Sequence, residues 1–482
     1  YGDVLERIET KTFTAPFGIV SAKVVNSKGQ FDDKSAIADQ MRGAIRELHA
    51  RGCRIINISL GDADKIAYAD GRASAWAATL DEMARTLDVL ILVSAGNSGS
   101  GRNAPWGADP DGIVTGYPKY LFEPSNRIID PAMAACVLTV GSLAHGNGLR
   151  VDPHETADIR ALAERDHPTP ITRTGPGVNG AVKPELVDYG GTAVFNGATQ
   201  KLMLGAHWDS AGIVTTHAKY QDALFTAATG TSMAAPRVAF KAALLLRRFP
   251  EASANLLRAF LATCANVPDA AVACLDKVAD DAVERCCGYG IPDVEKALSS
   301  EERRIIRYAD KQRIEIDQFA LYEVPIPEDF RRVKGRRHIR VTLAFDPPVR
   351  HTRLEYLGVR MSYRLIRGMT PDEIYEHYRW RPRSEEWPEL PDRNNCKLEP
   401  GYKSRQPSTL QSATFVMRRD VETYGEVYYL AVFADRRWAG EDVSHQRYAA
   451  VVELMHEGEV QLYQQSRQYE EARQRERERQ RT

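Results

Sequence analysis

Short runs of β-branched residues alternate with helical patterns early in the chain, between Ile19 and Ser142. The alternation predicts βαβ units, and therefore an α/β fold in which a parallel sheet carries helices on both faces. Between the first two runs, apolar residues repeat at helical spacing from Ser35, the expected N-cap, to Gly52, the expected stop. The predicted strands are Ser21–Val25, Arg54–Ile58, Val89–Ser94 and Val137–Val140. Such sheets bind ligands at the carboxyl ends of their strands, so functional residues are expected there.

Length and charge exclude several classes of protein. The chain has 482 residues, which favours two or three domains. It carries 64 Lys and Arg against 65 Asp and Glu, a formal net charge of −1, so no overall field attracts nucleic acid or an acidic membrane. Its apolar runs are shorter than the roughly 20 residues that span a bilayer. We therefore expect neither nucleic acid nor membrane as a partner, and the sequence leaves the oligomeric state open.

Cysteine usage bears on metal binding and on location. The seven cysteines show no spacing typical of a zinc site, and no other metal site is expected. Buried free thiols are the simplest interpretation. They favour a cytoplasmic protein, because disulfides form and persist in oxidising surroundings.

The pattern changes near Ser299, where alternating apolar residues typical of half-buried strands begin. We expect a first domain over residues 1–300, a β-sandwich-like domain over 301–460 and a charged helical or disordered tail over 461–482. One helix should interrupt the second domain, with Thr370 as N-cap, Pro371 as its first residue and Glu373 as capping-box partner. The predicted strands there are Arg313–Asp317, Ile339–Phe345, Leu354–Tyr363, Ala413–Met417, Val427–Phe433 and Ala449–Leu454.

One serine has the surroundings of a nucleophile. Ser232 opens a long apolar helix pattern that we expect to be central and buried, with Pro236 in or near its first turn. Small neighbours at Gly230 and Ala234 would let a substrate carbonyl approach, and the helix dipole would favour the negative charge that follows attack. A simple N-cap serine is the alternative. Asn97 favours the catalytic interpretation, because a carboxamide at the tip of a neighbouring strand can donate to an oxyanion.

Three motifs carry a resemblance to a known family. The segments INISLG at 56–61, VSAGNSG at 93–99 and GTSMAAP at 230–236 resemble, in this order, motifs of the subtilisin-like serine proteases, the subtilases. KPELVDYGG at 183–191 resembles the segment that precedes the nucleophile in that family, and GYGIPDVEKAL at 288–298 resembles the close of its catalytic domain. The resemblance covers about residues 15–300 and implies a subtilisin-like sheet and serine endopeptidase activity on proteins or peptides.

The resemblance also implies roles for single residues. Ser232 would be the nucleophile, and Asn97 with the Ser232 backbone N–H would form the oxyanion hole. The pocket for the side chain that precedes the scissile bond would be walled by Ser59, Leu60, Gly61, Ser94, Ala95 and Gly96, and Thr231 would also bind substrate. Many subtilases bind calcium, but no ligand set for it can be identified here, and no cofactor is expected.

The sequence departs from the family pattern in one respect. It contains neither the catalytic Asp motif nor the HGT motif of the catalytic His, which we expect to lie upstream of Tyr1. Without them the chain alone should hydrolyse peptides barely or not at all. We interpret five histidines that follow Asn97 as structural or surface residues: His145, His154, His167, His207 and His217. Two functions therefore stay open: a serine endopeptidase, and a subtilase fold kept as a non-catalytic scaffold or recognition module.

Overall fold

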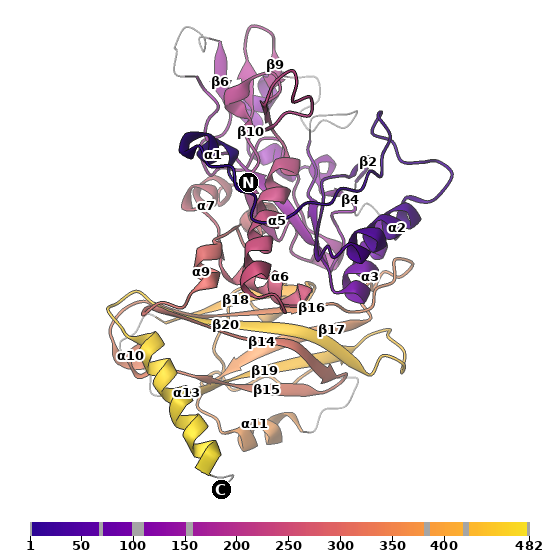
Figure 1. The fold of residues 1–482 in the computed structure, drawn as a ribbon. Helices are drawn as coiled ribbons and strands as arrows, with labels where there is room; N and C mark the ends of the chain where they lie inside the picture. Colours follow the sequence, from indigo (N-terminus) through magenta and orange to yellow (C-terminus); the bar gives the residue numbers. More distant parts are fainter. Residues whose placement is uncertain are drawn as a thin grey trace. The chain divides into compact units, whose positions relative to one another are not determined.

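The computed structural model describes residues 2–66, 71–98, 110–150, 158–379, 386–417 and 424–479. Its chain divides into two compact units, which Figure 1 draws in one view. The first unit comprises residues 1–294 together with 349–356, and the second comprises residues 295–348 and 357–482.

A four-stranded parallel sheet with the order β1-β3-β5-β7 is the centre of the first unit. Its strands are β1 (Ile55–Ile58), β3 (Leu90–Ser94), β5 (Leu138–Leu143) and β7 (Leu186–Tyr189). All five residues of β3 are buried, so both faces of the sheet are covered at this strand. The α/β fold with a parallel sheet is thus confirmed.

Helices pack around this sheet, and the one predicted between Ser35 and Gly52 is observed close to those bounds. They include α2 (Ile37–Ala50), α3 (Ala75–Leu87), α5 (Thr231–Arg248) and α6 (Ala254–Thr263). The Ser74 hydroxyl accepts a hydrogen bond from the Ala77 N–H and so caps α3. The N-cap of α2 is Ala36 rather than the expected Ser35, and no side chain caps this helix. Gly52 follows its C-cap with φ of 84°, as a left-handed stop requires.

Smaller elements complete the first unit. They are α1 (Val4–Thr10), β2 (Asp62–Ile66), α4 (Pro110–Gly116), β4 (Ile129–Asp130), β6 (Ile159–Ala161), β8 (Val194–Asn196), β9 (Lys201–Met203), β10 (Ile213–Thr216), β11 (Phe225–Ala228), β12 (Ala265–Asn266), α7 (Asp269–Leu275), α8 (Ala282–Cys287) and β13 (Ile291–Pro292). The short helix α9 (Val294–Leu298) spans the boundary between the two units.

The strand predicted over Ser21–Val25 is absent from the structure. This segment is irregular, and the apolar side chains just before it are exposed, Ile19 at 85%. It lines a cavity of about 1030 Å³ together with residues of α2, and it pairs with no strand. A strand needs a neighbour for its backbone hydrogen bonds, and the local sequence pattern does not supply one.

Helix α5 is only partly buried, in contrast to the prediction of a central, enclosed helix. It packs against all four strands of the parallel sheet. The face toward the sheet is fully buried and carries Ala234, Ala235, Val238, Ala242 and Leu245. The remaining apolar residues, including Phe240, are half-buried. The apolar residues of this helix therefore cover more of its surface than the face that is fully buried.

A segment from far along the chain contributes to the core of the first unit. Tyr356 is fully buried there and donates a hydrogen bond of 2.7 Å to Oδ2 of Asp81 on α3. The same carboxylate accepts the backbone N–H groups of Ala135 (2.8 Å) and Cys136 (2.7 Å). Burial raises the pKa of Asp81, and these three donors oppose that shift.

We expect Tyr356→Phe to reduce the free energy of unfolding of the first unit by about 1–3 kcal/mol, because Asp81 stays buried with one donor fewer. Urea unfolding measures the loss, and hydrogen exchange at the Ala135 and Cys136 amides should accelerate with it. Tyr375→Phe is the matched control, since the Tyr375 side chain is 51% exposed. Equal stability of the two variants would contradict a structural role for this hydrogen bond.

The second unit is a β-sandwich. One antiparallel sheet has the order β14-β20-β16-β18 and the other β15-β19-β17, and side chains from both sheets form a common core. The strands are β14 (Arg304–Glu315), β15 (Phe319–Pro325), β16 (Arg337–Phe345), β17 (Val359–Ile366), β18 (Leu410–Met417), β19 (Val427–Arg436) and β20 (His445–His456). The helices are α10 (Glu328–Arg332), α11 (Pro371–Tyr378), α12 (Tyr402–Arg405) and α13 (Leu462–Arg479).

Sequence patterns located most of this unit. The capping box of α11 forms as predicted, with Thr370 and Glu373 bonded reciprocally. The predicted strand over Leu354–Tyr363 begins later, at Val359, because residues 349–356 belong to the first unit. Strand β15 was not predicted. Across the described residues of both units, no helix combines the length and apolarity that crossing a bilayer requires.

Candidate active site

Asn97 lies just beyond the carboxyl end of β3 and is tied to the start of α5. Its side-chain oxygen accepts hydrogen bonds from the backbone N–H of Thr231 (2.8 Å) and from the Thr231 hydroxyl (3.1 Å). That hydroxyl in turn accepts the Gly96 N–H at 3.2 Å. Since Thr231 engages the oxygen, the carboxamide is held in one orientation and its Nδ2 group is left as a donor.

Gly230 keeps the space beside that donor open. A Cβ at this position would lie 3.0 Å from Asn97 Nδ2 and 3.4 Å from its Oδ1. Any larger residue would therefore press on the carboxamide. This close approach gives a physical reason for glycine directly before Thr231.

Ser232 is the second residue of α5 and directly follows Thr231. Backbone N–H groups in the first turn of a helix have no partner within the helix, and that of Ser232 is one of them. The side chains of Ser232 and Asn97 are half-buried, whereas Thr231 is fully buried. Within the described ranges, no side chain is hydrogen-bonded to the Ser232 hydroxyl.

The end of β1 also reaches the start of α5. Pro236 is the sixth residue of the helix, a little further along than predicted, and it has no N–H to donate to the Ser232 carbonyl. The Ser59 hydroxyl approaches that carbonyl at 3.4 Å and accepts the Asn57 side-chain amide at 3.1 Å. Segments after β1 and β3 therefore converge on the same turn of α5.

The two predicted walls of the pocket lie on either side of the Ile129 side chain. No pattern in the sequence points to a role for this residue. Ser94, Ala95 and Gly96 are buried, Ser59 and Leu60 are half-buried, and Gly61 is exposed. Both Gly61 and Gly96 face the side chain of Ile129 at close range. The structure thus brings the two walls together around Ile129.

Arg173 anchors the backbone at Asn97. The guanidinium donates to the backbone carbonyls of Asn97 (3.0 Å), Ser125 (3.0 Å) and Arg127 (2.9 Å). The residue is 3% exposed, and burial lowers the pKa of its guanidinium. Sequence reasoning missed Arg173, because nothing in its local pattern distinguishes it from a surface arginine.

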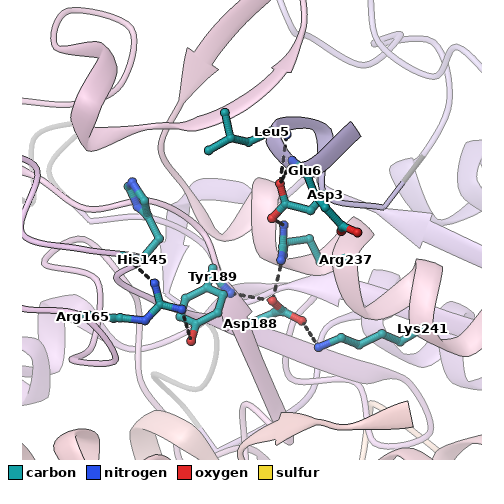
Figure 2. Close-up of polar contacts among 9 residues, drawn as sticks. All are labelled: Asp3, Leu5, Glu6, His145, Arg165, Asp188, Tyr189, Arg237 and Lys241. Carbon is teal, nitrogen blue, oxygen red and sulfur yellow. Dashed lines mark hydrogen bonds and ion pairs between the residues drawn. The ribbon is translucent and has the colours of Figure 1, made fainter. Parts of the chain in front are cut away.

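A charge cluster fixes the second turn of α5 to the end of β7, as Figure 2 shows. The Asp188 carboxylate is buried and pairs with Arg237 Nε at 2.9 Å and Lys241 Nζ at 2.5 Å. Arg237 also reaches Asp3 at 3.1 Å, whose other oxygen caps α1. These contacts hold the helix that carries Ser232.

His145 is the first histidine after Asn97, and it lies near this cluster in Figure 2. Its backbone carbonyl accepts a hydrogen bond from Arg165 at 3.2 Å, and burial lowers the pKa of its imidazole. The structure shows no hydrogen bond between His145 and Ser232. His154 lies outside the described residues. In addition, the described residues include no group of three or more His, Cys, Asp or Glu side chains placed to hold a metal ion.

The structure thus combines a parallel α/β sheet with a serine at a helix N-terminus and a carboxamide beside the start of that helix. The model of the subtilase family matches residues 14–290, and the chain belongs to this family. Its members cleave peptide bonds, so the fold is that of a protease and the implied substrates are proteins or peptides.

Individual relatives extend the comparison. The chain is 46% identical over 431 residues to the uncharacterized protein y4bN of Sinorhizobium fredii, an alignment that covers 89% of this chain and 98% of the relative. Among solved structures, the prenylagaramide maturation protease PagA is 18% identical, with a TM-score of 0.33, over 55% of this chain and 69% of that one. A lanthipeptide protease is 20% identical, with a TM-score of 0.32, over 55% and 67%.

Proposed function

We propose that the protein is a serine endopeptidase in which Ser232 is the nucleophile and Asn97 the oxyanion donor. The observation that carries this proposal is the double hydrogen bond from Thr231 to the Asn97 side-chain oxygen. It holds the carboxamide beside the residue that precedes Ser232 and leaves Nδ2 as its donor. A protein with only a structural use for this turn has no need of an oriented donor there.

The proposed reaction proceeds through an acyl-enzyme. The Ser232 oxygen attacks the scissile carbonyl carbon while its proton passes to a general base, and the C=O electron pair moves onto oxygen. Asn97 Nδ2 and the Ser232 N–H donate to that oxyanion. The base then protonates the amine, which departs, and water releases the acyl group. Apart from the water that releases the acyl group, each step uses side chains and backbone only, and no cofactor.

The general base is proposed to be a histidine, oriented by an aspartate, in sequence that precedes Tyr1. Two observations support the proposal that such a segment packs beside β1 and the segment around Ser21–Val25. Strand β1 is at the edge of the described sheet, and the segment around Ser21–Val25 borders a cavity of about 1030 Å³. His145 is set aside for this role, because its backbone is tied to Arg165 and its ring makes no hydrogen bond to Ser232.

A fluorophosphonate probe on the complete protein tests this function. The Ser232 oxygen would attack phosphorus, fluoride would leave, and the hydroxyl proton would pass to the base. We expect one phosphonyl group per protein molecule. Mass spectrometry should locate it on the peptide that contains Ser232. A folded, complete protein that stays unlabelled, or that is labelled only on other serines, would favour the non-catalytic scaffold.

A further inference from the structure

The side chain of Ile129 occupies the space between the two pocket walls. A Cβ added to Gly61 would lie 2.7 Å from Ile129 Cδ1, and a Cβ added to Gly96 would lie 2.6 Å from Ile129 Cγ1. Both glycines are thus in direct contact with the same isoleucine, one from each wall. Ile129 is only 6% exposed, so little space around its side chain is left for solvent.

The backbone around Ile129 is anchored to both walls. Its N–H donates to the carbonyl of Ala95, in the second wall, at 3.4 Å. Strand β4, which begins with Ile129, pairs antiparallel with β2, the strand that directly follows Gly61. The next residue, Asp130, accepts the hydroxyl of the α3 N-cap, Ser74. Moving Ile129 out of the space between the walls would therefore require β4 to move as well.

We infer that Ile129 sets the specificity of the site by filling the pocket for the side chain that precedes the scissile bond. The inference rests on the proposed function, because it assumes that a substrate carbonyl lies beside Ser232 and Asn97. Protein interiors are close-packed, so a space already filled by a branched side chain has no room for a large second one. Substrates with glycine, alanine or serine at this position are accepted, whereas phenylalanine, leucine and lysine are excluded.

The first test measures the pocket without requiring catalysis. Removing a buried apolar side chain can leave a dry cavity that binds small aromatic molecules. We expect ¹⁹F NMR to detect fluorobenzene bound to Ile129→Ala but not to the wild type. Ile128→Ala is the matched control, because Ile128 is also buried but adjacent side chains on an extended chain point to opposite sides.

The second test measures specificity with two peptide boronic acids that differ only in an alanine or phenylalanine side chain next to boron. The Ser232 oxygen donates its electron pair to boron and its proton passes to water, which leaves a tetrahedral anionic adduct. On the complete protein we expect the alanine compound to bind at least tenfold more tightly than the phenylalanine compound. The affinity of Ile129→Ala for the phenylalanine compound should be at least tenfold higher than that of the wild type. In Ile128→Ala the affinity for neither compound should change.

The outcomes separate the two proposals. A wild type that binds both boronic acids equally well would overturn the role of Ile129, and so would an Ile129→Ala protein that gains neither fluorobenzene nor the phenylalanine compound. If no protein binds either boronic acid, the proposed function fails, and the fluorobenzene result then reports only whether Ile129 fills the space between Gly61 and Gly96. Should Ile129→Ala fail to fold, Ile129→Val provides a smaller cavity for the same comparison.

Discussion

Replacing Asn97 by aspartate should slow fluorophosphonate labelling of Ser232 in the complete protein by roughly 100-fold or more, a scale that comes from the corresponding asparagine of a subtilisin. The carboxylate has the shape of the carboxamide and can still accept both hydrogen bonds from Thr231. It has no N–H to donate, however, and it adds negative charge where the oxyanion forms. The loss should therefore fall on the reaction rather than on the fold.

The controls for this prediction isolate the donor. Asn196→Asp makes the same chemical change in a turn where the Asn196 oxygen accepts the Thr199 N–H, and it should label at the wild-type rate. Ser232→Ala should not label at all. Thermal unfolding of Asn97→Asp should stay within a few degrees of the wild type, whereas Asn97→Ala, which also loses the Thr231 contacts, should unfold earlier. Wild-type labelling of Asn97→Asp would show that Asn97 is not the oxyanion donor.

The second large effect is expected at a buried ion pair between Lys183 and Glu185, which lies against the start of β5. Lys183 Nζ lies 2.6 Å from Glu185 Oε1, and these side chains are only 1% and 3% exposed. The ammonium also donates to the Val137 carbonyl (3.1 Å) and the Thr139 hydroxyl (3.2 Å). The second Glu185 oxygen accepts the Thr139 N–H at 2.8 Å. The pair thus joins the segment before β7 to the start of β5.

Lys183→Met should lower the free energy of unfolding by about 3–5 kcal/mol, because it leaves Glu185 buried without its counter-charge. Urea unfolding measures this loss. The double variant Lys183→Met/Glu185→Leu should recover most of it, since neither charge then remains in the core. Arg51→Met breaks an exposed pair with Glu47 and should cost less than about 1 kcal/mol. A Lys183→Met protein as stable as Arg51→Met would contradict this account.

The same variant should depend on pH in a defined direction. Burial already raises the pKa of Glu185 in the wild type, and the attraction of Lys183 opposes that shift. Without Lys183 the folded-state pKa of Glu185 rises further above its unfolded value of about 4.3. The folded state then binds the proton more tightly than the unfolded state, so stability falls as pH rises through this range. The free energy of unfolding that Lys183→Met loses relative to the wild type should accordingly be smaller at pH 5 than at pH 8.

Features set by near neighbours in the chain were predictable from the sequence. Thr370 and Glu373 cap α11 as predicted, because a capping box is a contact over a few residues. The strand predicted over Val89–Ser94 is observed as β3, and all five of its residues are buried. Ser232 and Asn97 could also be selected as candidates from the sequence, since each lies in a short motif at one boundary of a predicted element.

Contacts between distant segments were decided only by the tertiary structure. The pattern over Ser21–Val25 favoured a strand, but a strand forms only where a neighbour accepts its hydrogen bonds. Ile129 contacts Gly61 and Gly96, and Arg173 donates to the Asn97 carbonyl, although both are distant from these partners in the sequence. Tyr356 donates to Asp81 from the other half of the sequence. Periodicity and capping report on spacing within one element, whereas the filling of a pocket depends on which segments meet in space.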